Sequence, residues 1–223
     1  MSVGAAARAV AARSERSRVR APLPASFYER ETELVARELL GTIIRCVSRA
    51  GVASGRIVET EAYLGEHDPG CHAAAGLTPR TSTLYGPPGT AYVYLSYGMH
   101  WCANAVTRRA GLPSAVLIRA IEPLEGLPIM RRRRRPVDAD RQLANGPGKL
   151  CAALGVTGAH NALPLQASSL TIHRGHEVPD ADVAVTPRIG LTKAADWPLR
   201  WIVADSPYLS RPYRPSPRSR TSR

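Results

Sequence analysis

A chain of 223 residues is long enough for one globular domain with a sizeable core, and an apolar fraction of 44% excludes a wholly disordered protein. Lysine and arginine number 30 against 18 acidic residues, which gives a formal net charge of +12 at pH 7. That excess predicts a polyanionic partner, because cationic side chains that neutralise phosphates release condensed counterions. Charge alone suits DNA, RNA, an anionic membrane surface or the ribosome equally.

Arginine is concentrated at the two ends of the chain. Residues 1–20 contain five arginines and residues 211–223 contain five more. The Ala, Ser, Pro and Arg composition of both ends opposes core formation, so we expect disordered arms at 1–22 and 211–223 around one domain at 23–210. Such arms would add non-specific affinity for phosphates. Tails without a specific role are the alternative, as is an organellar transit peptide at the N-terminal end.

The predicted elements begin with a helix over residues 26–40. Ser26 and Glu29 have the spacing of a capping box, and Leu34, Val35 and Leu39 form an apolar stripe. Strands are predicted over 42–47 and 55–63.

Residues 64–89 contain glycines, prolines and little periodicity, which predicts a long loop of the kind that is usually functional. A hairpin follows, with strands over 90–97 and 100–107 joined at Gly98-Met99.

The remaining elements alternate between the two types. A strand is predicted over 115–122, helices over 124–135 and 147–154, and further strands over 169–173 and 199–203. Strands precede and follow helices without a regular β-α-β order. The sequence therefore predicts a single α+β domain, a largely antiparallel sheet with surrounding helices and a protruding β-hairpin.

The four cysteines are widely spaced, include no C-x-x-C pair and follow no secretory segment. We therefore expect free thiols in a reducing compartment: the cytoplasm of a bacterium, near its nucleoid, or the nucleus of a eukaryote. Cysteine and histidine spacings suit no zinc site and no dinucleotide or Walker motif occurs, so neither a metal nor another cofactor is predicted. No apolar run approaches the roughly 20 residues that span a bilayer, so we expect no membrane contact and a soluble monomer.

Two carboxylates stand two residues apart in the segment from Arg56 to Gly65, at Glu59 and Glu61. On a strand they share a face, which Tyr63 continues. A carboxylate beside an aromatic wall suits cleavage of a glycosidic bond, because it activates water or stabilises the positive sugar that forms. An exposed strand edge with solvated acids is the alternative interpretation.

Tyrosines gather in one part of the sequence. Five of the eight lie between positions 63 and 97: Tyr63, Tyr85, Tyr92, Tyr94 and Tyr97. Tyr92 and Tyr94 point to one face of their strand, while Tyr97 lies near the hairpin tip. Stacked tyrosines accept a flat heterocycle, and a bulky side chain on a hairpin tip can wedge between base steps. A tyrosine-rich packed sheet would explain the same pattern.

Single residues add weaker signals. His72 could stack on a ligand or be merely solvated, and Asn104 could read a base edge or cap a turn. Arg119 lies within an apolar run, where burial without an acidic or phosphate partner would be costly. The arginines at 131–135 suit a solvated helix end or a patch that contacts phosphates.

Taken together, four ordered segments resemble the alkyladenine (3-methyladenine) DNA glycosylase family, the mammalian-type 3-methylpurine glycosylases. The segments run over residues 56–65, 89–99, 117–126 and 145–150, and the resemblance extends from about Leu23 to Arg211. It implies a single α+β domain with a protruding hairpin. His100-Trp101 departs from the mammalian pattern, which puts details of the duplex contact in doubt.

The resemblance implies a role for each matching position. Glu61 matches the catalytic glutamate that deprotonates water, and Arg119 matches an arginine beside the active site. Tyr63, His72 and Tyr94 match the residues that stack around the flipped base.

On the same resemblance, Tyr97 matches the intercalating side chain that fills the gap left in the duplex, and Asn104 matches the asparagine that screens purine edges. The implied partner is double-stranded DNA that contains damaged purines.

The chemistry follows from these matches. A purine alkylated at N3 or N7 is cationic and leaves readily, so one carboxylate suffices. No lysine falls near the motifs, so no Schiff base is expected and the product is an intact abasic site. Two rival functions are a non-catalytic nucleic-acid-binding module, which gives the paired acids no purpose, and a carbohydrate-active hydrolase, which does not explain the basic excess.

Overall fold

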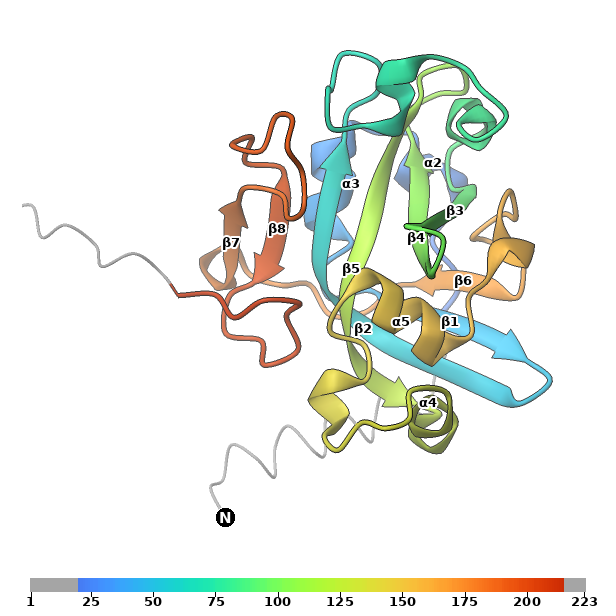
Figure 1. The fold of residues 1–223 in the computed structure, drawn as a ribbon, viewed down its shortest axis with the longest axis vertical. Helices are drawn as coiled ribbons and strands as arrows, with labels where there is room; N and C mark the ends of the chain where they lie inside the picture. Colours follow the sequence, from blue (N-terminus) through green and yellow to red (C-terminus); the bar gives the residue numbers. More distant parts are fainter. Residues whose placement is uncertain (1–19, 215–223) are drawn as a thin grey trace, which may run out of the picture.

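The computed structural model describes residues 20–214, which fold around one sheet of eight antiparallel strands (Figure 1). The strands are β1 (Ile43–Ser48), β2 (Gly51–Tyr63), β3 (Ala91–Ser96), β4 (His100–Thr107), β5 (Ser114–Glu125), β6 (Leu170–His173), β7 (Val183–Thr186) and β8 (Arg200–Val203). The helices are α2 (Ala25–Tyr28), α3 (Thr32–Glu38), α4 (Leu127–Arg133) and α5 (Pro147–Leu154). The predicted α+β class with an antiparallel sheet is therefore confirmed. Most of both predicted arms lies outside the described residues.

Strand β2 is the centre of the sheet. Along one edge it pairs with β5, and along the other it pairs first with β1, over residues 51–56, and then with β8, over residues 59–61. Two partners in succession leave no open edge beside Glu59 and Glu61, and both side chains are fully buried. The interpretation of these acids as solvated groups on a strand edge is wrong.

One apolar cluster joins the sheet to its helices. It contains Val35 and Leu39 from α3, Leu150 from α5, and Ile57 and Ile118 from the two central strands, each no more than 1% exposed. Burying such a side chain stabilises the fold by about 1.5–3 kcal/mol. The cluster thus fixes the orientation of β2 and β5, whose other residues carry the chemistry.

The helix predicted over residues 26–40 is wrong in its continuity, because the chain forms two short helices with a break after Tyr28. The Phe27 carbonyl accepts a hydrogen bond from Arg30 Nε, and the Tyr28 carbonyl accepts one from the Arg108 N–H. These tertiary contacts use carbonyls that a continuous helix would have bonded within itself.

Details of the helical pattern also differ from the prediction. Ser26 makes no capping hydrogen bond, and the helix begins after Pro24 instead. Leu34 is 45% exposed, whereas Val35 and Leu39 are buried. The apolar stripe is consequently one residue narrower than the sequence predicted.

Strands β2 and β5 are longer than predicted. Strand β2 starts at Gly51 rather than at residue 55, because residues 51–54 also pair with β1. Strand β5 continues to Glu125 through Pro123, so the helix predicted from residue 124 starts only at Leu127. The short strand β7 was not predicted.

The segment predicted as a loop over residues 64–89 is ordered by two 3-10 helices, η1 (His72–Ala75) and η2 (Ser82–Tyr85). Asp68 anchors its start. Its carboxylate accepts hydrogen bonds from the N–H groups of Leu64 and Gly70 and forms a fully buried ion pair with Arg188. The anchor holds the loop against the end of β2.

The four cysteines are free and buried. Within residues 20–214, no helix is long and apolar enough to cross a membrane. In the same part of the chain, no group of three or more His, Cys, Asp or Glu side chains could hold a metal ion.

Candidate active site

A small aromatic pocket of about 70 Å³ lies where β2, β3, β4 and η1 meet. Its lining includes four of the predicted site residues, Tyr63, His72, Tyr94 and Asn104, and one residue that the prediction placed beside them, Tyr92. Segments separated by more than 40 positions therefore converge on one cavity. Its volume is well below the roughly 300–1,000 Å³ of most ligand pockets, so a purine can enter only if the rings move apart.

The His72 ring meets the two tyrosine rings edge-on, and the tyrosine rings are tilted against each other by 32°. The centroids of His72 and Tyr94 are 4.5 Å apart at an interplanar angle of 74°, and those of Tyr92 and Tyr94 are 5.3 Å apart. His72 Nδ1 also lies 2.9 Å from the Tyr92 hydroxyl. Burial, helped by the positive charge of Arg80, lowers the pKa of His72. The imidazole is therefore neutral near neutral pH, so it can stand beside a cationic base without repelling it.

Asn104 lies on β4, opposite Tyr92 of β3, and is 5% exposed. Its amide nitrogen donates a hydrogen bond of 2.9 Å to the Tyr92 carbonyl. That bond fixes the side chain at the wall of the pocket, where its polar end can test the edge of a bound heterocycle.

Glu61 lies beneath the pocket and is linked to it by Tyr63. The Tyr63 ring lines the cavity, and its hydroxyl donates a hydrogen bond of 2.9 Å to Glu61 Oε2. Glu61 also accepts hydrogen bonds from Arg119 Nη1, at 3.2 Å, and from the Ile189 N–H, at 2.7 Å. The carboxylate thus has three donors.

Glu59 has four donors. Its carboxylate accepts hydrogen bonds from Arg119 Nε at 2.9 Å, from Arg200 Nε at 2.8 Å, and from both the N–H and the hydroxyl of Ser210 at 2.7 Å. A carboxylate offers about four acceptor positions. With three donors, Glu61 has one position left on Oε1 that can accept a hydrogen bond from water. Glu59 has one donor more, but three of its donors converge on Oε1 and only the Ser210 N–H reaches Oε2.

The two carboxylates also differ in acidity. Burial alone would raise the pKa of Glu59, but the charges of Arg119 and Arg200 and the hydrogen bonds from Ser210 hold it below its ordinary value. Burial does raise the pKa of Glu61, which Arg119 and the hydrogen bonds from Ile189 and Tyr63 offset only in part. A general base works best when its pKa is near the operating pH, so these environments favour Glu61 over Glu59.

Arg119 is the shared partner of both acids. The β2–β5 register is irregular here, since Glu59 pairs with Ala120 and Thr60 with Ile118, so Arg119 falls at a bulge. A bulge re-aims the side chain of the extra residue. Arg119 is 7% exposed, and although burial would lower its pKa, Glu61 and Glu59 raise it. The guanidinium stays charged. The sequence predicted that it would need an acidic partner, and it has two, Glu59 and Glu61.

Tyr97 lies far out on the β3–β4 hairpin. It is 87% exposed and has a φ of 50°, in the left-handed region that few non-glycine residues adopt. Ser96 and His100 form the last pair of the ladder below it, and Met99 beside it is 71% exposed. The tip therefore presents two large apolar side chains to solvent, which suits insertion between base pairs.

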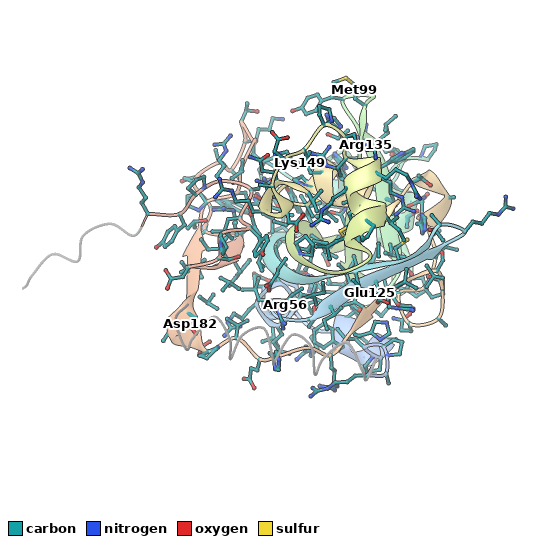
Figure 2. All side chains as sticks on the ribbon, turned by 90° about the horizontal axis from the view of Figure 1, so that it is seen from below. Arg56, Met99, Glu125, Arg135, Lys149 and Asp182 are labelled. Carbon is teal, nitrogen blue, oxygen red and sulfur yellow. The ribbon has the colours of Figure 1, made fainter. Side chains whose placement is uncertain are left out.

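The arginines at 131–135 are partly structural. Arg133 donates hydrogen bonds to the carbonyls of Ala153 and Leu154 at the C-terminal end of α5, and Arg134 donates one to the Leu143 carbonyl. Viewed from below, Arg135 and Lys149 lie toward the same edge of the molecule as Met99 (Figure 2). Arg135 thus lies on the side of the hairpin tip.

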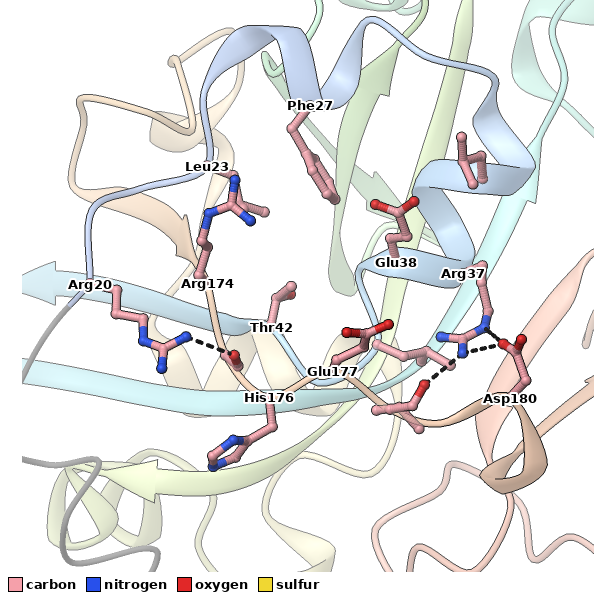
Figure 3. Close-up of a pocket in the computed structure, with 14 residues that line it drawn as sticks. Arg20, Leu23, Phe27, Arg37, Glu38, Thr42, Arg174, His176, Glu177 and Asp180 are labelled. Carbon is pink, nitrogen blue, oxygen red and sulfur yellow. Dashed lines mark hydrogen bonds and ion pairs between the residues drawn. The ribbon is translucent and has the colours of Figure 1, made fainter.

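A larger cavity of about 720 Å³ lies between the α2–α3 region and residues 174–180 (Figure 3). It shares no lining residue with the aromatic pocket. Two of its charged groups are paired within the fold: Arg37 is bonded to Asp180, and Glu38 to Arg30. It offers one phenyl ring, Phe27, and no stack of rings for a flat base. The aromatic pocket remains the candidate site.

Several residues of the site were missed by sequence reasoning. Arg200 carried a signal, because, like Arg119, it is an arginine within an apolar strand. Asp68 and Arg188 form a buried ion pair, with the Arg188 guanidinium 4.7 Å from the Tyr63 ring centre, but neither stands in a recognisable motif. The Ile189 N–H could not be found from side-chain identity, because the donor is backbone.

Comparison with known proteins identifies the family of the chain. Residues 26–207 match the family described as methylpurine-DNA glycosylase (MPG). Relatives named "Putative 3-methyladenine DNA glycosylase" are 50% identical in Myxococcus xanthus, over 85% of this chain and 93% of the relative, and 50% identical in Rhodopseudomonas palustris, over 84% and 87%. A relative of the same name in Chlorobaculum tepidum is 44% identical over 85% and 90%.

The family match and these relatives define a hydrolytic enzyme of DNA repair. The chain belongs to the methylpurine-DNA glycosylase family.

Proposed function

We propose that this protein flips alkylated or deaminated purines out of duplex DNA and hydrolyses their N-glycosidic bond with water activated by Glu61. The observation that carries the proposal is the position of Glu61: a buried carboxylate with a raised pKa and one unfilled acceptor position, joined to an aromatic pocket through Tyr63. Family membership supplies the class of substrate, a methylated purine in DNA.

Recognition in this proposal rests on charge and shape. Tyr63, His72 and Tyr94 enclose the flipped base. An alkylated purine is cationic, and tyrosine rings attract a cation through their quadrupoles. The neutral state of His72 avoids repulsion. Asn104 tests the edge of the base from the wall of the pocket.

In the chemical step, Glu61 accepts a proton from water. The oxygen of that water bonds to C1′ of the deoxyribose as the C1′–N bond breaks, and the bonding electron pair leaves with the base. A base that is already cationic becomes neutral on leaving, so no general acid is required. Arg119 holds Glu61 in place through a 3.2 Å contact.

The product in this proposal is an intact abasic site. A lyase needs an amine that forms a Schiff base with the sugar. The chain has two lysines, Lys149 and Lys193, and neither lines the aromatic pocket. Lys149 is bonded to Asn145 at the start of α5.

A wedge at the hairpin tip completes the proposal. Base extrusion leaves a gap in the duplex, and the exposed Tyr97 ring has the size and position to fill it. A non-catalytic DNA-binding module would need the wedge and the positive charge, but it would leave the buried pair Glu59 and Glu61 without a purpose.

The test is excision from methylated duplex DNA. The protein is incubated with the duplex, and free base and alkali-labile sites are measured. We expect wild-type protein to release base, and Glu61→Gln to lower single-turnover excision by roughly 10²–10⁴-fold with DNA affinity retained. Glu125→Gln, at the exposed end of β5, is the matched control. Near wild-type excision by Glu61→Gln would sink the assignment.

A further inference from the structure

Glu59 is the buried charged residue that the proposed mechanism leaves without a role. It is fully buried and two residues from Glu61, yet none of the residues that bond to it lines the aromatic pocket. A buried carboxylate is costly unless it is paired and bonded. Its partners therefore indicate what it does.

Two of those hydrogen bonds come from the C-terminal segment. After β8 the chain turns back over the sheet, and Leu209, 5% exposed, packs in a small cluster with Val58, Ala120 and Ile202. This cluster lies at the irregular part of the β2–β5 pairing. Leu209 thereby seats the next residue, Ser210, whose N–H and hydroxyl both donate to Glu59.

The partner on the opposite side is Arg119, which divides its donors between the two acids. Its Nε donates to Glu59 and its Nη1 to Glu61, while Nη2 lies 3.4 Å from the Ser210 hydroxyl. A planar guanidinium that is fixed through one nitrogen has its other nitrogens fixed in direction as well.

We propose that Glu59, itself held by Arg200 and Ser210, is a positioning residue that fixes the Arg119 guanidinium against the general base. The C-terminal segment is on this inference a part of the active site. The inference rests on the proposed function, because it takes Glu61 as the base.

The charges around Glu61 give the inference a signature in pH. Five residues from four parts of the chain interact with it: Arg119 from β5, Arg188 from the segment after β7, Tyr63 and Glu59 from β2, and Cys102 from β4. Of these, Glu59 is the negative charge that raises the pKa of Glu61. If Glu59 is made neutral, Arg119 faces a single carboxylate, and Glu61 should ionise at lower pH.

The decisive variant is Glu59→Gln, assayed by single-turnover excision across a pH series. We expect the acidic limb of the profile to move to lower pH by on the order of one unit. We also expect the plateau rate to fall by about 10- to 100-fold, because Arg119 loses its fixed partner. A merely structural residue would lower the amount of folded protein without moving the limb. A wild-type profile for Glu59→Gln would overturn the inference.

If Glu59→Gln does not fold, variants of the serine that bonds to Glu59 test the same inference with a smaller change. Ser210→Ala removes one donor to Glu59 and should slow excision several-fold at an unchanged melting temperature, whereas Ser210→Thr keeps the hydroxyl and should restore the rate. Ser206→Ala is the matched control, since its hydroxyl contacts the Tyr208 N–H and not Glu59. Equal rates for Ser210→Ala and Ser206→Ala would refute the inference.

The two hypotheses fail in different ways. Excision by Glu61→Gln at the wild-type rate would remove the proposed base itself. Loss of excision in Glu61→Gln, combined with wild-type behaviour of both Glu59→Gln and Ser210→Ala, would leave the proposed function standing and overturn only the role of Glu59.

Discussion

Glu59 and Glu61 have the same chemistry and the same burial, and only their hydrogen-bond partners separate them. Three charged or hydroxyl-bearing residues, Arg119, Arg200 and Ser210, stabilise the ionised form of Glu59. Glu61 has one arginine, one tyrosine hydroxyl and one backbone N–H. At the scale of single residues, the hydrogen-bond donors around each carboxylate therefore distinguish the proposed base, Glu61, from the proposed positioning residue, Glu59.

This difference predicts the pH dependence of excision. Only ionised Glu61 can accept a proton, and burial raises its pKa, so activity should decline on the acidic side at a higher pH than an ordinary glutamate would give. Tyr63→Phe keeps the ring but removes a donor to the ionised carboxylate, so it should move this decline to still higher pH. Single-turnover rates at a series of pH values measure both effects.

Tyr85→Phe is the control for that experiment, because its hydroxyl bonds to Glu66 and not to Glu61. Its profile should match that of the wild type. A decline at the pKa of an ordinary glutamate, or an identical profile for Tyr63→Phe, would contradict the assignment.

At the scale of elements, the β3–β4 hairpin carries both a wall of the aromatic pocket and the exposed tip that we propose as a wedge. Tyr94 lies in the pocket near one end of β3, and Tyr97, three residues further, stands in solvent at the turn. The rigid ladder from Ala91 to Ser96 sets the spacing between pocket and tip. A wedge built on such a ribbon can enter the duplex while the pocket receives the base.

The hairpin predicts a separation between flipping and chemistry. Tyr97→Ala should weaken binding to a lesion in duplex DNA far more than to the same lesion in a single strand, because only the duplex has a gap to fill. Stacking is worth about 1–3 kcal/mol per base, so the loss should be measurable as a change in Kd. Equal losses on both substrates would argue against a wedge.

The Asp68–Arg188 ion pair also acts between elements. It joins the loop over residues 64–89 to the segment whose Ile189 N–H bonds Glu61. Asp68→Asn would leave Arg188 charged and buried, which should destabilise the fold by about 3–5 kcal/mol at neutral pH. Denaturant unfolding measures this loss. The control is Asp180→Asn, because Asp180 is an exposed carboxylate that pairs with Arg37, and this change should cost no more than about 1 kcal/mol.

The acid dependence of stability follows from the same pair. Burial would raise the pKa of Asp68, but the hydrogen bond from Arg188 and two backbone N–H groups lower it. A depressed folded-state pKa gives stability that is present above the unfolded pKa and is lost as pH falls through the folded one. Asp68→Asn should therefore lose less stability in acid than the wild type does. Parallel acid sensitivity in both proteins would contradict this role.

At the scale of the whole molecule, the positive charge is the feature that the site does not explain. Residues 1–19 and 215–223 contain seven arginines and one glutamate. Arg20 contacts the described domain through Gly175, and Tyr213 contacts it through the cluster around Leu209. Trimming should accordingly stop short of these two residues.

Removal of residues 1–19 and 215–223 should leave base release from a saturated complex unchanged. It should weaken binding to any DNA, with or without a lesion, because phosphate contacts do not depend on sequence. Each lost contact lowers the slope of log K against log salt by about 0.9, so we expect a change of a few units. Kd values for full-length and trimmed protein across a salt series measure it. An identical slope would show that the arms do not touch DNA.

The sequence by itself determined the class of fold and indicated the candidate site residues. Alternating apolar patterns located strands over 42–47 and 100–107 close to where they lie. Two-residue spacing placed Glu59, Glu61 and Tyr63 on one side of β2. There Arg119 bonds to both glutamates, and Tyr63 bonds to Glu61. These are local properties, because strand periodicity and side-chain chemistry depend on neighbours within a few positions.

The family resemblance pointed to Glu61, but the physical reason that favours it over Glu59 as the proposed base lies only in the tertiary structure. Ile189 and Ser210 reach β2 from 128 and 151 positions away in the chain, and one of these donors is purely backbone. The break after Tyr28 has a similar origin, since its carbonyl is taken by Arg108. Burial and the supply of hydrogen-bond donors set the acidity of a carboxylate, and both depend on which distant segments pack beside it.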